Sequence, residues 1–239
     1  PHSNNLSYSS SDGALDSVRA IQKMIRGTEY HGGKFMAPIQ AKHIDITPKG
    51  PIVQTNLDNL QADLIVLAAG INVDQFKPIL NINKPLLQSS TPGIIITTKP
   101  MKKFLNTVCY TSDCHFHQQT DGKIIIGEKS GAPRTNAHKE LYANLPNKYP
   151  NQALAIDHAH RILSMVKRYV PKISNAEIEK ISIGWRPLPL DGLPIVGHIP
   201  AQPSIYIASM HSGVTLAPII GYLSSKEILD DVRTDQLSD

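Results

Sequence analysis

An arginine at the end of an apolar segment is the first residue whose type and position could support chemistry. Arg186 follows residues 178–183 in the run Gly184-Trp185-Arg186-Pro187. Its guanidinium is permanently charged and carries two parallel donors, so it can hold a carboxylate bidentately and orient it. Pro187 disfavours the helical region for Arg186 and keeps it extended. Arg186 is therefore the candidate that binds a carboxylate substrate, and pairing with a structural acid such as Asp191 is the alternative.

A second candidate site lies where a strand leads into a helix. Residues 204–209 predict the strand, and the run after it enters a helix expected over residues 214–229. The free N–H groups of the first helical turn, and the positive end of the helix dipole, point at whatever lies above Gly213. A plain strand–turn–helix connection is the alternative. The candidates for contact with an electron-rich group are Ser212, Gly213, Val214 and Thr215.

The apolar strand expected over residues 64–69 is a third candidate because it ends in Ala68-Ala69-Gly70. Small residues at the carboxyl end of a strand let a flat cofactor or a phosphate approach the backbone closely. Ala69 and Gly70 are therefore candidate cofactor contacts. Any α/β protein can end a buried strand in this way, so the order of this motif relative to the others carries the interpretation.

In order and spacing, these segments resemble the flavin and substrate end of a known family. Asp12-Gly13-Ala14-Leu15-Asp16 precedes them, and Asp191-Gly192-Leu193-Pro194-Ile195-Val196-Gly197 adds a turn in which Gly192 is expected at positive φ. The sequence is similar to the C-terminal portion of the FAD-dependent oxidoreductases of the D-amino-acid oxidase, glycine oxidase and sarcosine oxidase family. The resemblance implies a carboxylate-binding role in catalysis for Arg186. It implies cofactor contacts at Ala69, Gly70, Gly197, Ser212, Gly213, Val214 and Thr215.

The activity implied by the resemblance is oxidation of the C–N bond of an amino acid or N-methyl amino acid. Hydride would pass to the flavin, and the imine would then hydrolyse. The helix start at Gly213 would stabilise the negative charge that reduced flavin carries around N1 and O2. In relatives that hold FAD through a cysteine thioether, the cysteine lies in the segment equivalent to residues 188–196. Because Cys109 and Cys114 both precede that segment, the expected FAD is non-covalent.

The family's opening glycine loop has no counterpart here. No segment reads Gly-x-Gly-x-x-Gly after a strand, the loop that normally receives the dinucleotide pyrophosphate. We therefore expect the C-terminal portion of such an enzyme. The alternative is a non-catalytic remnant or one half of a split protein that needs a complementary N-terminal segment or subunit. A flavin-dependent tRNA- or folate-linked modification enzyme on the same scaffold is disfavoured because it would need a basic surface.

Periodicity predicts an α/β (α+β) fold that positions these segments. An incomplete FAD-binding Rossmann-like domain is expected over residues 1–71 and 181–239, with a mixed or antiparallel-sheet substrate domain over residues 72–180 between its parts. Asp12 is expected to cap a helix that Gly27 ends and that packs one face on a sheet. One further helix is expected over residues 152–169. The remaining strands are expected at residues 35–47, 52–57, 93–98, 104–110, 123–128 and 178–183.

Composition narrows the class of protein. With 239 residues, 41% of them hydrophobic, the chain can bury a sizeable core. Its net charge of +4 is spread along the sequence, which argues against nucleic-acid binding, and no apolar run approaches the about 18 residues of a membrane span. Cys109, Cys114, His115 and His117 lack a second ligand pair, so no metal is expected. Two cysteines without a signal-peptide pattern predict a cytoplasmic protein. The family resemblance implies a small amino acid or amine as its partner.

Overall fold

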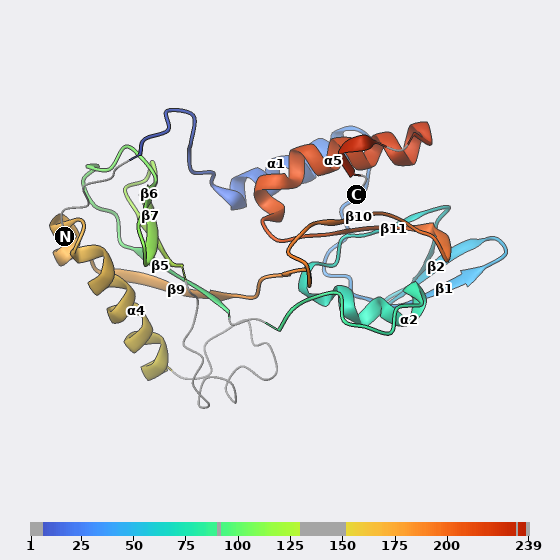
Figure 1. Ribbon diagram of the computed structural model, residues 1–239, viewed down its shortest axis with the longest axis horizontal. Helices are drawn as coiled ribbons and strands as arrows, with labels where there is room; N and C mark the ends of the chain where they lie inside the picture. The colour runs from blue at the N-terminus through green and yellow to red at the C-terminus, as the bar shows by residue number, and fades with distance from the viewer. Residues whose placement is uncertain (1–6, 90–91, 130–151, 233, 238–239) are drawn as a thin grey trace. The chain divides into compact units, whose positions relative to one another are not determined.

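The computed structural model describes residues 7–89, 92–129, 152–232 and 234–237. Packing divides the chain into two compact units (Figure 1). Unit 1 comprises Pro1–Ala20 and Thr91–Trp185, and unit 2 comprises Ile21–Ser90 and Arg186–Asp239. The mixed α/β class with antiparallel sheets is confirmed. The domain limits expected from the sequence, at residues 71 and 180, stay a prediction.

Unit 1 is a five-stranded antiparallel sheet with a long helix, α4, along one face (Figure 1). At one end of the sheet, Gly93 pairs with Gly184, so the strands that begin and end the second segment of unit 1 lie side by side. Helix α4 spans Gln152–Lys167, and a 3-10 turn, η2, follows at Pro171–Asn175. In sheet order the strands are β6 (Cys109–Tyr110), β7 (Cys114–Gln118), β8 (Ile124–Glu128), β5 (Gly93–Thr98) and β9 (Ile178–Gly184).

Alternation along the strands and helical spacing along α4 create the core of unit 1. Successive strand residues point to opposite faces, so every second residue of β5, β7 and β8 is buried against the helix. The helix contributes residues at intervals of three and four, which form one apolar stripe. The buried cluster includes Ile94, Ile96, Cys114, Phe116, Ile124, Ile126, Ala159, Ile162, Leu163 and Val166.

A buried glutamine organises the long loop that precedes β6. Gln118 is the last residue of β7, and its side-chain carbonyl accepts hydrogen bonds from the N–H groups of Phe104 and Leu105, at 2.9 and 3.2 Å. Its amide donates to the carbonyls of Met101 and Gly122, at 3.1 and 3.0 Å. The strand predicted over residues 104–110 is therefore wrong for most of its length. Only Cys109–Tyr110 forms a strand, because Gln118 satisfies the backbone of the first part of the loop.

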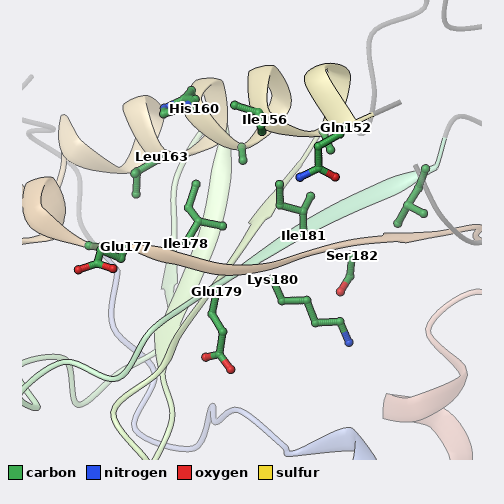
Figure 2. Close-up of a pocket in the computed structure, with 14 residues that line it drawn as sticks. Gln152, Ile156, His160, Leu163, Glu177, Ile178, Glu179, Lys180, Ile181 and Ser182 are labelled. Carbon is green, nitrogen blue, oxygen red and sulfur yellow. The ribbon is translucent and has the colours of Figure 1, made fainter. Parts of the chain in front are cut away.

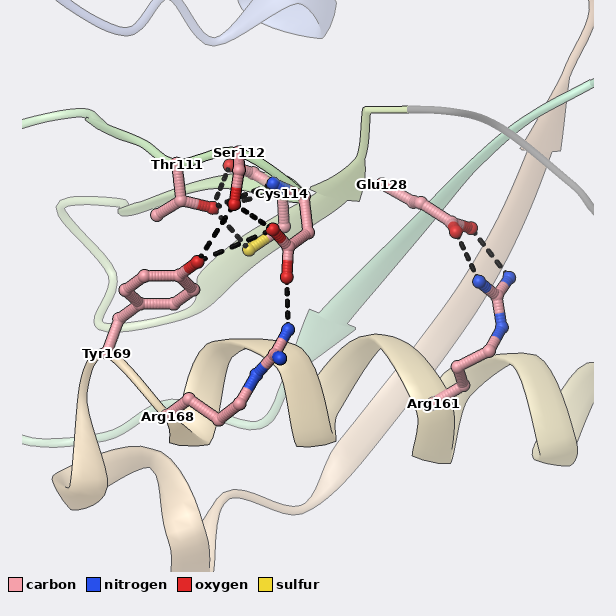
Figure 3. A network of polar contacts seen from close by, with 8 residues as sticks. Thr111, Ser112, Cys114, Glu128, Arg161, Arg168 and Tyr169 are labelled. Carbon is pink, nitrogen blue, oxygen red and sulfur yellow. Dashed lines mark hydrogen bonds and ion pairs between the residues drawn. The ribbon is translucent and has the colours of Figure 1, made fainter. Parts of the chain in front are cut away.

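Two ion pairs connect α4 and the residue after it to the sheet (Figure 3). Arg161 donates to both carboxylate oxygens of Glu128, with 2.6 Å between Nη2 and Oε2, and the Glu128 side chain is only 2% exposed. Arg168 pairs with Asp113 in the turn between β6 and β7, where the carboxylate is 26% exposed. A hydrogen bond from the Ser112 hydroxyl, together with the Arg168 charge, lowers the pKa of Asp113 below its usual value.

Unit 2 contains two three-stranded sheets. One is the antiparallel sheet β1 (Ala41–Thr47), β2 (Gly50–Thr55) and β3 (Asn59–Gln61). Its first turn needs a glycine, because Gly50 has φ of +107° and a Cβ there would lie 2.6 Å from the Ala62 carbonyl oxygen. The other sheet has the order β10 (Ile195–Ile199), β11 (Gln202–Ser209) and β4 (Ile65–Leu67). The helical elements that lie wholly in unit 2 are η1 (Gly70–Phe76), α2 (Lys77–Leu80), α5 (Gly213–Asp230) and η3 (Asp235–Leu237).

The first helix, α1, differs from its prediction in three respects. It spans Ser17–Tyr30, so it continues past Gly27. The Asp16 carboxylate, rather than that of Asp12, accepts a hydrogen bond from the Arg19 N–H at 3.1 Å, the geometry of an N-cap. None of the helix residues is buried, so the expected packing on a sheet is absent from the described part of the chain.

The strand expected over residues 35–47 is also too long. It begins at Ala41, because Pro38 lacks the N–H that a sheet ladder needs. Most other expected elements lie within a few residues of the observed ones. The positive φ expected at the 191–192 turn is confirmed, at +85° for Gly192.

Replacing Gln118 tests its role in ordering the loop. Gln118→Leu keeps the volume but leaves buried backbone donors without partners, so we expect the free energy of unfolding to fall by about 2–4 kcal/mol. Urea unfolding measures this. Gln119→Leu is the matched control, because its side chain is only half-buried. Equal losses in the two variants would contradict the assigned role.

The two ion pairs should differ in their contribution to stability. Arg161→Met leaves the buried Glu128 carboxylate without its guanidinium partner, so we expect a loss of about 3–5 kcal/mol. Arg168→Met should have a much smaller effect, since water reaches both members of its pair. Denaturant unfolding of the two variants side by side provides the comparison. A larger loss for Arg168→Met would overturn this ranking.

Candidate functional site

The candidate site begins where two parallel strands end at the same edge of a sheet. Strand β11 pairs with β4 in parallel, with Ile205 opposite Ile65 and Ile207 opposite Leu67. The segment that leaves β4 contains Ala69 and Gly70, and β11 leads into the N-terminus of α5. The register therefore brings these two predicted cofactor segments together at the carboxyl ends of the strands, where open α/β sheets bind ligands.

Gly70, Gly197 and Gly213 are among the seven glycines of unit 2 that have open space where a side chain would lie. Gly70 has φ of +55° and Gly197 has φ of +145°, conformations that favour glycine. A Cβ at Gly70, Gly197 or Gly213 would meet no heavy atom within 4 Å apart from its immediate neighbours. Gly197 lies on β10, opposite Ile207, and so one strand away from the edge segments. This open space fits a flat ring that approaches the backbone.

The N-terminus of α5 has no side-chain cap. Ser212, at the N-cap position, has φ of +60° and makes no side-chain bond to the helix. Its hydroxyl instead lies 2.7 Å from His211 Nδ1. The Leu216 N–H donates to the Ser212 carbonyl at 3.0 Å, which leaves the N–H groups of Gly213, Val214 and Thr215 ahead of this helical bond. Residues 211–215 are exposed, so these donors are accessible to an electron-rich ligand.

Arg186 lies apart from these elements in the strand order. It is half-buried in the irregular stretch 185–188 after β9, and the strand registers do not connect it with the other candidates. Within the described ranges it makes no ion pair with an acid, and the Asp191 carboxylate accepts from the Leu193 N–H at 2.9 Å instead. The structural pairing considered for Arg186 and Asp191 is therefore not observed.

The residues just after Arg186 are bound to a second segment of unit 2. The Gln88 N–H donates to the Leu188 carbonyl at 2.7 Å, and the Gln88 side-chain amide donates to the Pro189 carbonyl at the same distance. The Leu190 N–H donates to the Leu86 carbonyl at 3.1 Å. These bonds fix the backbone that follows Arg186 and limit where its side chain can reach.

A buried tyrosine, which the sequence did not single out, helps to position α5. Tyr206 lies at the centre of β11, and its hydroxyl donates to Glu227 on α5 at 2.8 Å. Burial raises the pKa of Tyr206 to about 12, so it stays protonated and acts as a donor at neutral pH. Burial would raise the pKa of Glu227, but hydrogen bonds from Thr234 and Tyr206 lower it overall, so it accepts as a carboxylate. The two residues are 21 positions apart, one on a strand and one on a helix, so no local sequence pattern predicts this contact.

Parallel strands whose carboxyl ends meet an uncapped helix N-terminus and small residues characterise a dinucleotide-binding fold. Comparison with known families identifies which one. The family model described as FAD dependent oxidoreductase (DAO) matches residues 4–226. The chain therefore belongs to this family, and the resemblance inferred from its motifs is confirmed.

Individual relatives support the assignment at low sequence identity. An opine oxidase subunit of Agrobacterium tumefaciens (strain Ach5) is 25% identical over 233 residues, which cover 97% of this chain and 57% of the relative. The glycine oxidase of Bacillus subtilis (strain 168) is 20% identical over 216 residues, or 89% of this chain and 54% of the relative. The chain thus spans a little over half the length of these relatives.

Solved structures show the same fold. The L-proline dehydrogenase of P. horikoshii superimposes with a TM-score of 0.73 at 17% identity, covering 91% of this chain and 56% of that one. The glycine oxidase of Geobacillus kaustophilus gives a TM-score of 0.70 at 19% identity, covering 85% of this chain and 51% of that one.

Within the described residues, no three His, Cys, Asp or Glu side chains gather as a metal site requires, and no helix is long and apolar enough to span a membrane.

Proposed function

We propose that this chain forms the flavin and substrate end of an FAD-dependent oxidoreductase that oxidises the C–N bond of an amino acid or N-methyl amino acid. The observation that carries the proposal is the uncapped N-terminus of α5, which begins beside the segment after β4. Membership of the FAD-dependent family supports the choice of cofactor. Both cysteines are free thiols and lie in unit 1, outside the cofactor segments, so the flavin in this proposal is non-covalent.

The backbone at the start of α5 would act electrostatically. When bound, FAD supplies a two-electron acceptor for the hydride that leaves the substrate. The N–H groups of Gly213, Val214 and Thr215, with the positive end of the helix dipole, stabilise negative charge that develops next to them. Ala69, Gly70 and Gly197 keep the approach open because they carry little or no side chain. The donors are held in place by the helix, so they need no reorganisation during the reaction.

Arg186 would hold the substrate carboxylate. Its guanidinium has no acidic partner in the described structure and carries a permanent charge, so a carboxylate can occupy both of its parallel donors. Such a clamp fixes the orientation of the reacting carbon, and positioning of this kind lowers a barrier by several kcal/mol. The imine product would then hydrolyse in water.

A second candidate function is that of a half protein that requires a complementary segment. The matched part covers only 57% and 54% of two relatives, and the given sequence contains no glycine-rich pyrophosphate loop. Among the described strands, β4 has β11 as its only neighbour, and Val66 on β4 is exposed. The Agrobacterium relative is itself named as one subunit of an oxidase. In this version the complement supplies the seat of the pyrophosphate, and the assembled pair is the active enzyme.

Titration with FAD tests the proposed cofactor site. We expect the purified chain, alone or co-expressed with a complement, to perturb the visible absorbance band of added FAD. Gly213→Asp should abolish this change, because a carboxylate would occupy the open space and repel the electron-rich ring. An aspartate at a helix N-terminus does not weaken the helix, so the loss would not reflect unfolding.

Gly27→Asp is the control, since it adds the same charge at a glycine with equal room for a Cβ. A flavin spectrum that is unperturbed by every form of the protein would contradict the proposed function. The remaining interpretation would then be a non-catalytic remnant.

Replacing the arginine tests the substrate clamp. In the flavin-bound form, Arg186→Met should weaken binding of acetate, used as a probe carboxylate and detected by its effect on the flavin spectrum, by roughly tenfold or more. Arg186→Lys should have an intermediate effect, because lysine keeps the positive charge but lacks the two parallel donors of the guanidinium. An amine substrate without a carboxylate should be oxidised equally well by all three forms. Unchanged affinity for acetate in Arg186→Met would remove Arg186 from the site.

A further inference from the structure

Charged side chains beside the groove between α4 and β9 in unit 1 show how this protein satisfies most of its polar groups (Figure 2). Glu177 pairs with Lys99, and Glu179 pairs with Lys123. In native proteins the rule is stricter for buried groups, because a buried donor or acceptor without a partner has lost its hydrogen bonds to water. A buried polar side chain that lacks a partner therefore calls for a physical reason.

Ser209, the last residue of β11, is such a side chain. It is only 1% exposed, and its hydroxyl makes no hydrogen bond to any of the residues that the structure describes. A hydroxyl that is removed from water without a new partner destabilises the fold that contains it. A ligand that supplied the missing partner would recover this free energy, so the hydroxyl favours the ligand-bound state.

The alternation of β11 shows on which face of its sheet the Ser209 side chain lies. Successive strand residues point to opposite faces, so Ser209 shares a face with Ile205 and Ile207. Those two residues belong to the core cluster that also contains Val73 and Phe76 of η1. The Ser209 side chain therefore lies on the face that η1 covers.

On this face, Ser209 lies among segments that are candidates for cofactor contact. The parallel ladder of β11 and β4 ends two residues before Ser209 on one strand and two residues before Ala69 on the other. On its other side, Ser209 pairs with Ile195 of β10. A Cβ at Gly70, the residue after Ala69, would meet only open space. Rotation about the Cα–Cβ bond moves a serine hydroxyl between staggered positions, so it can turn toward a ligand at this edge.

The surroundings of Ser209 fit a flat ring better than a phosphate group. A phosphate is charged and requires several donors, which one hydroxyl between the apolar side chains of Ala69 and Ile195 does not provide. A heterocyclic ring instead places its faces against small apolar residues and needs only a few well-placed polar groups at its edge.

We propose that Ser209 is a further cofactor-binding residue, whose hydroxyl donates a hydrogen bond to an acceptor atom of the flavin ring. The inference rests on the proposed function, because FAD is the ligand. It gives the end of β11 a role distinct from that of the start of α5. The backbone N–H groups of α5 stabilise charge, whereas the Ser209 hydroxyl fixes the position of the ring.

Ser209→Ala separates this role from a structural one. The ligand-free variant should unfold in urea at the same concentration as the unchanged protein or at a higher one, because the substitution removes an unpaired hydroxyl and no hydrogen bond. In the FAD titration, the dissociation constant should rise roughly three- to tenfold, since one hydrogen bond to the ligand is lost. Ser204→Ala is the matched control, because it makes the same change near the other end of β11. It should leave the affinity for FAD unchanged.

Vibrational spectra of bound FAD identify the group that Ser209 contacts. A hydrogen bond weakens the C=O or C=N bond of the atom that accepts it, so one such band of the ring should shift in Ser209→Ala. The same band should stay in place in Ser204→Ala. The phosphate bands should stay in place in both variants. A purely structural role for Ser209 would not produce this pattern.

Several results would overturn the inference. Lower stability of ligand-free Ser209→Ala would show that the hydroxyl already has a partner in the chain. Ring bands that stay in place, or a shift confined to the phosphate bands, would exclude a bond to the ring and leave the proposed function intact. Failure of the unchanged protein to bind FAD would contradict both, and the first titration reveals it before any variant is measured.

Discussion

The parallel pairing of β11 with β4 is the contact on which the proposed cofactor site depends. It joins segments that are 140 residues apart, Ile65 with Ile205, through a short ladder. Parallel strands cannot be joined by a tight turn, so a long crossover must separate them, and here that crossover contains most of unit 1. Bringing such distant segments together carries a loop-closure cost, which the buried Ile205, Tyr206 and Ile207 help to offset. If this pairing failed, Gly70 and Gly213 would no longer lie at one edge.

In unit 1, polar side chains provide hydrogen bonds and ion pairs where the strands and the helix leave polar groups without partners. Its strands are connected by irregular segments whose backbone groups need partners inside the protein. Gln118 supplies them for the loop before β6, and Glu128 with Arg161 joins the central strand β8 to the helix. Gln118 bonds to several backbone groups, and Arg161 binds both oxygens of Glu128, so the loop and the helix are fixed against the sheet.

The elements best predicted from the sequence are those with a local periodic signal. The helix expected over residues 152–169 is observed at Gln152–Lys167, and β5 has the predicted bounds. The family was also accessible, because its motifs are short and ordered. Contacts such as that of Tyr206 with Glu227 were not predictable, since they depend on which segments meet in space. Helix α1 shows a different kind of error. Its apolar residues Val18, Ile21 and Met24 have the predicted helical spacing, but they are exposed, so the predicted packing on a sheet is wrong for the described residues.

The second segment of unit 1, Thr91–Trp185, is joined to unit 2 at both of its ends. Residues 86–88 bond to residues 188–190, and a few residues further on Gly93 pairs with Gly184. The two ends of this segment therefore lie close together, like the ends of an inserted module. Such a module can be exchanged between relatives without altering the ladder of β4 and β11.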